Sequence, residues 1–306
     1  MSRYLMPLLL IYNVLSKNAS RQKIIENFHK NILGKYPDKS ELKLSHDGNL
    51  GHWLESNLGG SIDADGNADL DGFECKIESK KTTWGDWGAN YRIFCDKSYK
   101  LFSKQYAFEN MWILVKALGI KRDTLKNGIY YSMSGADVPA YINDITNIGL
   151  SLKESKGDIS YIYNFSADQR VSKNEIVPNE LQKDDLLINK WYGTNKSFNR
   201  FKENVISNNL PIEVKWDGSN ASVSLEERIR RKFGIYGIVI GLSNESKGFY
   251  GLKFLKNISF DDWLNFFKNK NVFYDTALTT RNNRPYNQWR SKAQFMKTLE
   301  EEIYIP

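Results

Sequence analysis

The sequence predicts a mixed α/β protein. Segments with the helical period of about 3.6 residues and segments with the two-residue period of a strand both occur along the chain. They do not follow one another in the regular order of a β-α-β protein. The chain has 306 residues, of which 41% are hydrophobic and 26% are charged, so it is long enough for one large domain or two modest ones.

The chain begins with segments of helical character. Residues 1–15, MSRYLMPLLLIYNVL, predict a buried helix rather than a signal peptide, because the apolar run is short and is interrupted by Pro7. Residues 20–33 place their apolar side chains along one helical stripe that ends at Gly34. Residues 51–60, GHWLESNLGG, predict a short helix that ends at the two glycines.

Strand character begins at residues 73–79, FECKIES. Phe73, Cys75 and Ile77 alternate there with charged residues, so the two sets are expected on opposite sides of a strand. Residues 235–242, IYGIVIGL, are apolar throughout, which is typical of a strand inside a sheet. Further strands are predicted at residues 91–96, 157–167, 211–219, 248–260 and 271–278. Helices are predicted at residues 224–234 and 258–270, and residues 279–299 begin as a polar loop and finish as a helix.

Charge and cysteine content narrow the class of function. A net charge of +7 fits an anionic partner such as nucleic acid, and it fits a need for solubility equally well. Cys75 and Cys95 lie outside any Cys-x-x-Cys or Cys/His cluster, which argues against a zinc site or a disulfide scaffold and favours a reducing cytoplasm. No run approaches the ~20 apolar residues of a membrane span, so we expect a cytoplasmic protein without a membrane partner.

Residues 66–80, GNADLDGFECKIESK, allow two interpretations. One is a calcium-binding EF-hand loop, whose positions 1, 3, 5, 6 and 12 would be filled by Asn67, Asp69, Asp71, Gly72 and Glu78. An EF-hand needs a helix on each side of its loop, whereas a glycine-rich turn precedes this stretch and a strand pattern follows it. Calcium binding is therefore the weaker interpretation.

The other interpretation is the catalytic hairpin of a Mg²⁺-dependent nuclease. Phosphodiester hydrolysis needs a divalent ion that offsets developing charge and lowers the pKa of the attacking water. Asp69 and Glu74 can bind that ion, and the carbonyl oxygen of Cys75 can complete the set because Mg²⁺ prefers oxygen ligands. Lys76 projects from the same strand face as Glu74 and can orient the water. A solvated hairpin with a charged outer face is the plain alternative.

Three features together resemble one enzyme family. A Leu54-Glu55 pair lies on a short predicted helix upstream of the acidic turn. Residues 69–76, DLDGFECK, space an Asp, a Glu and a Lys as in the PD-(D/E)XK motif. Towards the C-terminus follow an apolar strand, an acidic turn, a second strand, a helix and a strand that leads into a basic loop. The chain is in these respects similar to the PD-(D/E)XK type II restriction endonucleases of the MutH/MvaI/BcnI-like group.

The resemblance implies a fold and a division into lobes. The fold would be a mixed sheet flanked by helices, with two lobes around a DNA-binding cleft. Residues 1–105, with core strands from about 233–260, would form the catalytic lobe. Residues 106–306, including a loop at 279–292, would form the DNA-recognition lobe.

The resemblance also implies a reaction and partners. The reaction is Mg²⁺-dependent, sequence-specific cleavage of double-stranded DNA, with Glu55, Asp69, Glu74 and Lys76 as catalytic residues and Asp69, Glu74 and Cys75 as metal ligands. We expect a monomer, or a dimer on DNA, in the cytoplasm of a prokaryote that also makes a cognate DNA methyltransferase. A MutH-like repair endonuclease that nicks one strand and a catalytically inactive DNA-binding protein are the alternatives left open.

Residues 281–290, RNNRPYNQWR, are rich in side chains with planar hydrogen-bonding groups. Arg can pair with guanine, and Asn or Gln with adenine. The chain departs from the family here, because the family's His-Asp pair is missing, so the target sequence stays open. DNA contacts are expected from Arg281, Asn282, Asn283, Arg284, Tyr286, Gln288 and Arg290, and phosphate contacts from Lys80 and Lys81. The basic cluster of Arg228, Arg230, Arg231 and Lys232 is interpreted as the solvated face of a helix.

Overall fold

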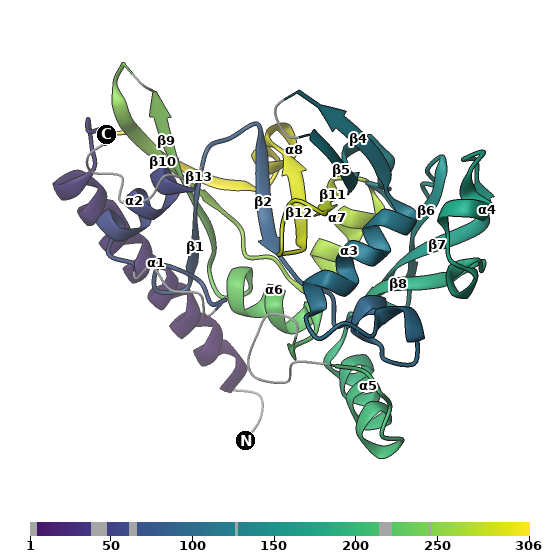
Figure 1. Cartoon of the computed structure of the whole chain (residues 1–306). Coiled ribbons are helices and arrows are strands. Elements are labelled where there is room, and N and C mark those ends of the chain that lie inside the picture. Colours follow the sequence, from purple (N-terminus) through teal and green to yellow (C-terminus); the bar gives the residue numbers. More distant parts are fainter. Residues whose placement is uncertain (1–4, 38–47, 61–65, 126–127, 214–221, 245) are drawn as a thin grey trace. The chain divides into compact units, whose positions relative to one another are not determined.

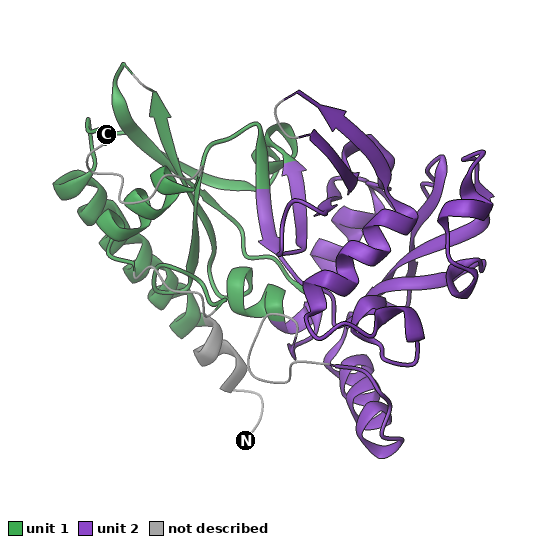
Figure 2. Cartoon of the chain, in the orientation of Figure 1, with its two compact units in different colours: residues 1–82, 228–260, 292–306 green, residues 83–227, 261–291 purple. Residues whose placement is uncertain are grey.

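The computed structural model divides the chain into two compact units, coloured separately in Figure 2. Unit 1 comprises residues 1–82, 228–260 and 292–306, and unit 2 comprises residues 83–227 and 261–291. The catalytic lobe predicted from residues 1–105 with core strands from about 233–260 differs from unit 1 in its boundary near residue 82 and in the C-terminal residues 292–306. The functions predicted for the lobes stay predictions. The structure describes residues 5–37, 48–60, 66–125, 128–213, 222–244 and 246–306. Within them, no helix is both long enough and apolar enough to cross a membrane.

Unit 1 is built on a mixed four-stranded sheet with the order β1-β9-β10-β13 (Figure 1). β1 runs parallel to β9, whereas β10 is antiparallel to both β9 and β13. The bounds are Phe73–Ile77 for β1, Gly237–Asn244 for β9, Gly248–Leu255 for β10 and Glu300–Tyr304 for β13. The strands predicted around β1, β9 and β10 are confirmed, and β1 lies at an edge of the sheet.

Helices α1 (Leu5–Asn31) and α2 (Asn49–Leu58) pack on this sheet. The end of α2 follows from Gly59, whose φ of 98° gives a left-handed cap that a residue with a side chain adopts at a cost. The three predicted N-terminal helical segments are confirmed, and the first two of them lie in the single helix α1. The expected burial is wrong for residues 11–15, which are largely exposed, because the contacts of α1 with the core begin further along at Ile24.

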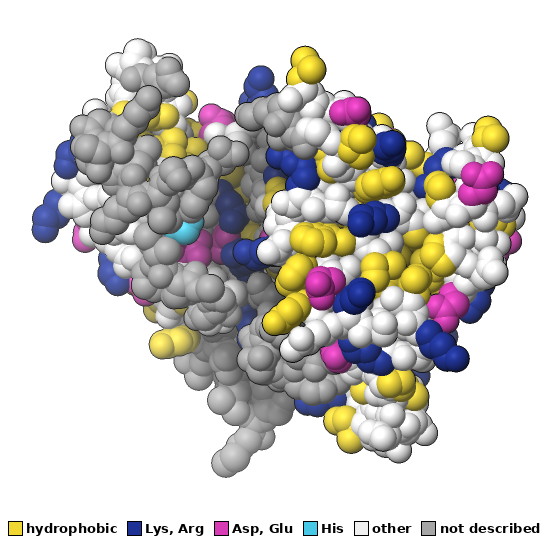
Figure 3. Space-filling view, in the orientation of Figure 1, with side chains coloured by type: hydrophobic (Ala, Val, Ile, Leu, Met, Phe, Trp, Pro, Cys, Tyr) yellow, Lys and Arg dark blue, Asp and Glu magenta, His cyan; other side chains and the backbone are white. Residues whose placement is uncertain are grey.

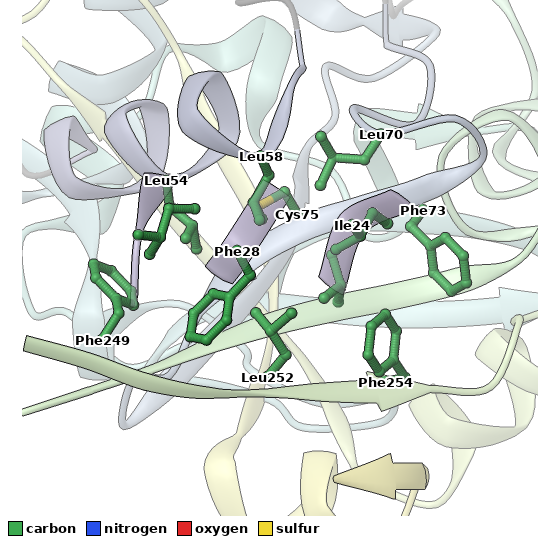
Figure 4. Packing of buried hydrophobic residues seen from close by; sticks show 12 residues of the cluster. Ile24, Phe28, Leu54, Leu58, Leu70, Phe73, Cys75, Phe249, Leu252 and Phe254 are labelled. Atoms are coloured by element: carbon green, nitrogen blue, oxygen red, sulfur yellow. The ribbon is translucent and has the colours of Figure 1, made fainter. Parts of the chain in front are cut away.

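The apolar core of unit 1 lies between the two helices and one face of the sheet (Figure 4). Helix α2 approaches β9 so closely that a Cβ atom on Gly241 would lie 2.5 Å from Leu54 Cδ2. The core contains Ile24, Phe28 and Ile32 from α1, Leu54 and Leu58 from α2, Leu70, Phe73 and Cys75 in and before β1, and Val239, Phe249, Leu252 and Phe254 from β9 and β10. Because Phe73 and Cys75 face this core, Glu74 and Lys76 face the other side of β1.

Two further sheets lie mainly in unit 2. One has the order β2-β12-β11-β5-β4 and the other the order β3-β8-β7-β6. In the first sheet the bounds are Lys81–Asp86 for β2, Tyr286–Lys292 for β12, Val272–Thr279 for β11, Gly128–Ser134 for β5 and Ile120–Thr124 for β4. In the second they are Tyr91–Arg92 for β3, Leu186–Trp191 for β8, Asp158–Asp168 for β7 and Ile148–Ser155 for β6.

The remaining helices include the two predicted between strands, α6 and α7, which are confirmed. Their bounds are Leu225–Phe233 for α6 and Phe260–Lys268 for α7, with Ala107–Leu118 for α3, Lys173–Ile176 for α4, Asn195–Ser207 for α5 and Ala293–Lys297 for α8. Short 3₁₀ turns lie at Ile93–Cys95, Lys100–Phe102, Gly135–Asp137 and Asn179–Leu181.

Two sequence predictions are corrected by these bounds. The strand expected at 91–96 is only two residues long, and a 3₁₀ turn follows it. The loop expected at 279–292 is wrong over its second half, because residues 286–292 form β12, which pairs with β11. In β12, polar residues occur among both the half-buried and the buried side chains. The sequence therefore shows no alternation of polar and apolar residues there, and the strand was not predicted. Of the strand expected at 211–219, residues 214–219 lie outside the described residues.

Candidate active site

A tight turn brings two acidic residues together before and within β1. Asp71 and Gly72 have positive φ values of 45° and 100°, the combination that a type I′ hairpin turn requires and that an Asp-Gly pair readily adopts. The N–H groups of Leu70 and Phe73 each donate to the other residue's carbonyl oxygen over 2.9 Å. Asp69 and Glu74 are therefore opposite each other on the two arms of the hairpin, which explains their spacing in the sequence.

This hairpin rules out the EF-hand interpretation. A strand follows the acidic turn where an EF-hand has its second helix. The acids also engage different partners: Asp69 accepts a hydrogen bond from the N–H of Cys75 over 2.9 Å, Asp71 pairs with a lysine of α1 over 2.6 Å, and Glu78 pairs with a lysine of β10 over 3.1 Å. Three carboxylates with diverging partners do not converge on one calcium ion.

Glu74 is a buried carboxylate, 1% exposed, whose two oxygen atoms have different surroundings. Its Oε1 atom accepts a hydrogen bond from the ammonium of Lys76 and lies 3.0 Å from Nζ of Lys232. Its Oε2 atom is buried and has no hydrogen-bond partner within the described part of the chain. A buried carboxylate oxygen without a partner is costly, so this atom marks a place for a ligand with positive charge.

Lys232 was missed by the reasoning from sequence. It lies on α6, and both Lys232 and the buried Arg228 contradict the prediction that this basic cluster is a solvated helix face. The apolar stripe of α6, which includes Leu225 and Ile229, is fully buried. Arg228 and Lys232, four residues apart, flank that stripe and are carried inward with it. This spacing beside an apolar stripe was the only signal in the sequence.

Two more carboxyl groups adjoin Glu74. Burial, together with the charges of Asp69 and Glu74, raises the pKa of Glu55 to about 7. Burial, together with the charge of Glu74, raises the pKa of Asp69 to about 6. Gly60 is in contact with both residues, since a Cβ atom there would lie 2.9 Å from the carbonyl oxygen of Asp69 and 3.0 Å from Cγ of Glu55.

Lys76 remains charged in this environment. Burial lowers the pKa of Lys76, but the nearby carboxylates of Glu74 and Asp69 outweigh burial, so the pKa is raised above its usual range. Glu74 is the main acid responsible for the raised pKa of Lys76. In Figure 3, acidic and basic side chains meet where β1 lies.

These residues fit a hard divalent cation such as Mg²⁺. The unpartnered Oε2 of Glu74 and the raised pKa values of Asp69 and Glu55 all show that negative charge is crowded here, and a cation relieves such crowding. Among the described residues, no three His, Cys, Asp or Glu side chains are placed to hold a metal ion by themselves.

Cys75 can contribute only through its main chain. Its side chain belongs to the core of unit 1, and burial raises the pKa of its thiol well above the usual value, so the sulfur stays protonated. The main-chain carbonyl oxygen of Cys75 is therefore the group that can act as the predicted metal ligand.

The residues expected to contact DNA lie in two places. Arg281, Asn282, Asn283 and Arg284 lie in the connection between β11 and β12. Trp112 donates through Nε1 to the carbonyl oxygen of Asn282 over 3.1 Å, which anchors this connection to α3. Arg284 projects outward, with its side chain 81% exposed.

The second place is the strand β12 itself. Tyr286, Gln288 and Arg290 are half-buried and alternate with buried residues, so they share one face of the strand. Lys80 and Lys81, which precede and begin β2, are exposed, as phosphate contacts require. The predicted catalytic residues are in unit 1, whereas Arg281 to Arg290 are in unit 2.

The mixed sheet with Glu74 and Lys76 two residues apart on its edge strand, and an acid on the opposing arm, is the arrangement expected of a nuclease of the PD-(D/E)XK class. Residues 35–303 match the family model described as LlaMI restriction endonuclease. The chain belongs to this family.

One curated protein and two solved structures are similar to this chain. The type II restriction enzyme ScrFI of Lactococcus lactis subsp. cremoris is 34% identical over 286 residues, which cover 92% of this chain and 97% of that relative. The solved complex of restriction endonuclease MvaI with its cognate DNA substrate aligns with a TM-score of 0.48 and 11% identity, covering 100% of this chain and 99% of that one. MvaI in the absence of DNA aligns with a TM-score of 0.35 and 10% identity, and the match covers 85% of this chain and 86% of that one.

Family membership rests on the family model and on ScrFI. It confirms the predicted resemblance to restriction endonucleases and the predicted enzyme class, a site-specific deoxyribonuclease. Together with the mixed sheet of unit 1 and the helices on it, it also confirms the predicted restriction-endonuclease-like fold class. A DNA-binding cleft between two lobes stays a prediction.

Proposed function

We propose that the chain is a type II restriction endonuclease that cuts double-stranded DNA at a short specific sequence and requires Mg²⁺. The observation that carries this proposal is the buried Glu74, which is held by two lysines through Oε1 and has an unpartnered Oε2. Membership in a restriction endonuclease family and the name of ScrFI, a type II restriction enzyme, support it.

Asp69, Oε2 of Glu74 and the carbonyl oxygen of Cys75 would hold the ion. When bound, Mg²⁺ offsets the charge that develops on the scissile phosphate and lowers the pKa of the attacking water. Lys76 keeps its proton, so its ammonium can orient the attacking water and offset negative charge on the phosphate. Glu55, with a pKa of about 7, can hold a water or exchange a proton near neutral pH.

The substrate would be double-stranded DNA, as the class of type II restriction enzymes implies. Lys80 and Lys81 would bind phosphates, and the group from Arg281 to Arg290 would position and read the DNA. The enzyme would act in the cytoplasm of a prokaryote as a monomer, or as a dimer on DNA, beside a methyltransferase that protects the same sequence.

Digestion of a sequenced supercoiled plasmid tests the proposal. Wild type with Mg²⁺ should give discrete linear fragments with ends at one sequence, and Asp69→Asn and Glu74→Gln should give none. Asp71→Asn is the matched control, because Asp71 lies at the exposed tip of the same hairpin and Asn tolerates a positive φ. Failure of wild type to cut with Mg²⁺ or Mn²⁺ would contradict the proposal. Accumulation of nicked circles without linear DNA would favour the strand-nicking alternative.

A further inference from the structure

The open face of the β11–β12 hairpin carries a fixed cluster of polar side chains. Asp275 on β11 is directly opposite Gln288 on β12, and Arg290 is on the same face two residues further along. Arg290 donates through Nε to Oε1 of Gln288 over 2.6 Å and through Nη2 to the hydroxyl of Tyr286 over 2.6 Å. Its Nη1 pairs with Oδ2 of Asp275 over 3.1 Å. All three guanidinium nitrogens are therefore engaged, which sets the plane of the group.

The hairpin that carries this cluster is held firmly from its other face. Asn287 and Trp289 are 2% and 0% exposed and alternate with the cluster along β12. Tyr274 donates to Oδ1 of Asn287 over 2.5 Å and packs on the ring of Trp289 with the centroids 5.0 Å apart. Side chains on a strand anchored in this way are placed more accurately than side chains on a loop.

Stability does not account for the cluster. The side chains of Asp275 and Arg290 are 29% and 24% exposed, and ion pairs that retain contact with water contribute little to the free energy of folding. Arg290 has five N–H donors, of which three are occupied, so two remain for a ligand. Asp275 likewise retains acceptor capacity beyond its contact with Arg290.

We infer that Asp275 and Arg290 read one G·C base pair in the major groove, with Arg290 oriented by Tyr286 and Gln288. The two remaining donors of Arg290 match O6 and N7 of guanine, and the carboxylate of Asp275 can accept from N4 of the paired cytosine. A two-stranded ribbon is among the elements that the major groove admits. The inference rests on the proposed function, and it moves base reading from the Arg281–Arg284 connection to the strand face.

The exposed connection would then have a different task. Arg284, 81% exposed and 3.6 Å from the carboxylate of Asp86, lacks the fixed geometry that discrimination between bases requires. Contacts from such a side chain to phosphates strengthen binding to all sequences and depend on salt. Arg284 thus offers a matched comparison for Arg290: the same residue type in the same hairpin, but without the three fixed partners.

Binding can be measured apart from cleavage in an Asp69→Asn background with Ca²⁺. Selection from a random duplex pool gives the preferred sequence for this protein and for versions that also carry Arg290→Ala, Asp275→Ala or Arg284→Ala. The Arg290 and Asp275 variants should lose preference at one and the same G·C pair, with affinity for the selected duplex falling about 5- to 150-fold. Arg284→Ala should weaken all duplexes by one common factor and leave the selected sequence unchanged.

Modified DNA tests the same contacts without changing the strand. Replacing the guanine of that pair by 7-deazaguanine removes the N7 acceptor. Replacing the cytosine by N4-methylcytosine puts a methyl group in place of the N–H that faces the major groove. Each change should weaken binding by the Asp69→Asn protein, and the 7-deazaguanine change should have no further effect once Arg290 is replaced.

The inference is overturned if no sequence is enriched, if the Arg290 and Asp275 variants select with unchanged preferences, or if neither modified base weakens binding. The proposed function is judged separately, by whether wild type cleaves the selected duplex with Mg²⁺. Sequence selection without cleavage would leave the inference standing and the proposed function refuted. Cleavage by wild type, together with unchanged base preferences in the Arg290 and Asp275 variants, would support the proposed function and refute the inference.

Discussion

Glu74 shows at the scale of one residue how the site prepares for a cation. Its Oε1 faces two lysine ammonium groups, Lys76 from the same strand and Lys232 from α6, while Oε2 has no partner among the described residues. Two positive charges on one oxygen hold the carboxylate in place and direct the other oxygen at the position that a metal would occupy. We therefore predict that Lys232 acts on the reaction through Glu74, as a positioning residue.

Replacing Lys232 by Met should lower kcat/KM for DNA cleavage about 10- to 100-fold, the range typical of residues that orient a metal ligand. The physical reason is that Glu74 would lose one of the two cations that fix its orientation. The measurement is single-turnover cleavage as a function of Mg²⁺ concentration, where weaker positioning raises the Mg²⁺ requirement. Arg230→Met, on the exposed side of α6, is the control. Equal activity of the Lys232 and Arg230 variants would contradict the role.

The residues of the candidate site separate into those that the sequence could predict and those that it could not. Asp69, Glu74 and Lys76 lie within one hairpin, and the period of a strand is enough to place Glu74 and Lys76 on one face. Lys232 reaches Glu74 only because β9, which follows α6, lies beside β1 in the sheet. Local periodicity gives no information about which strands pair, so this lysine resembled an ordinary surface residue.

At the scale of an element, the Asp71-Gly72 turn decides whether Asp69 reaches Glu74. Gly72 has a φ of 100°, and a Cβ atom there would lie 2.6 Å from Cδ2 of Tyr236. Gly72→Ala combines an unfavourable φ with a steric clash, so we expect it to reduce the free energy of unfolding by about 1–3 kcal/mol. Cleavage should fall as well, because the arms of the hairpin shift relative to each other.

Urea denaturation checks the stability of Gly72→Ala, with Gly34→Ala as the control. Gly34 also has a positive φ, of 72°, but nothing lies within 4 Å of its added Cβ atom. The difference between the two variants isolates the clash with Tyr236 from the cost of a positive φ alone. Equal stability and equal activity of the two variants would show that the turn tolerates a side chain.

Strand β7 ends in a buried ion pair that links the stability of unit 2 to pH. Asp168 accepts hydrogen bonds from Nη2 of Arg170 over 2.6 Å and from the hydroxyl of Tyr163 over 2.8 Å. Burial alone would raise the pKa of Asp168, but the bonds from Arg170 and Tyr163 outweigh burial and lower the pKa. A lowered folded-state pKa contributes stability above the unfolded-state pKa of about 3.9, and this stability is lost as the pH falls through the folded-state value.

Asp168→Asn should remove that acid-dependent loss and reduce the free energy of unfolding at pH 7 by about 3 kcal/mol, since Arg170 would keep a charge without its partner. Urea denaturation between pH 3 and pH 7 measures both effects. Asp185→Asn is the control, because Asp185 pairs with Lys153 at a site where its side chain is 69% exposed and should contribute at most about 1 kcal/mol. A parallel pH profile for Asp168→Asn and wild type would refute the assignment.

The division into units is a property of the whole molecule that the sequence supplied only in part. Unit 1 takes segments from the beginning, the middle and the end of the chain, because β1 pairs with β9 and β10 pairs with β13. Residue patterns predicted the strands β1, β9 and β10 and the helices α1, α2, α6 and α7 of the described chain, but they did not predict β13, and the expected catalytic lobe of residues 1–105 with core strands from about 233–260 therefore lacked the C-terminal segment of unit 1. The loop predicted at 279–292 failed for a related reason: Asn287 is a polar residue that is buried by the fold.

The distribution of charge leads to the last prediction, at the scale of the whole molecule. The protein carries a net charge of +7, yet Glu55, Asp69 and Glu74 concentrate negative charge at the site where we propose that a DNA phosphate binds. Without a divalent ion this cluster should repel DNA. Asp69→Asn should therefore bind a labelled duplex about fivefold more tightly than wild type in EDTA at pH 8, where Asp69, with a pKa of about 6, is otherwise ionised.

Fluorescence anisotropy in EDTA and then in Ca²⁺ measures this difference. Ca²⁺ should raise the affinity of wild type more than that of Asp69→Asn, because only wild type keeps the full set of carboxylates that the ion neutralises. Asp71→Asn also removes one negative charge, but from the exposed tip of the hairpin. Pairing with Lys23 and solvent screening already reduce the effect of that charge, so this variant should bind DNA like wild type. If Asp69→Asn and Asp71→Asn gain the same affinity in EDTA, net charge alone governs binding and the acidic cluster does not repel DNA.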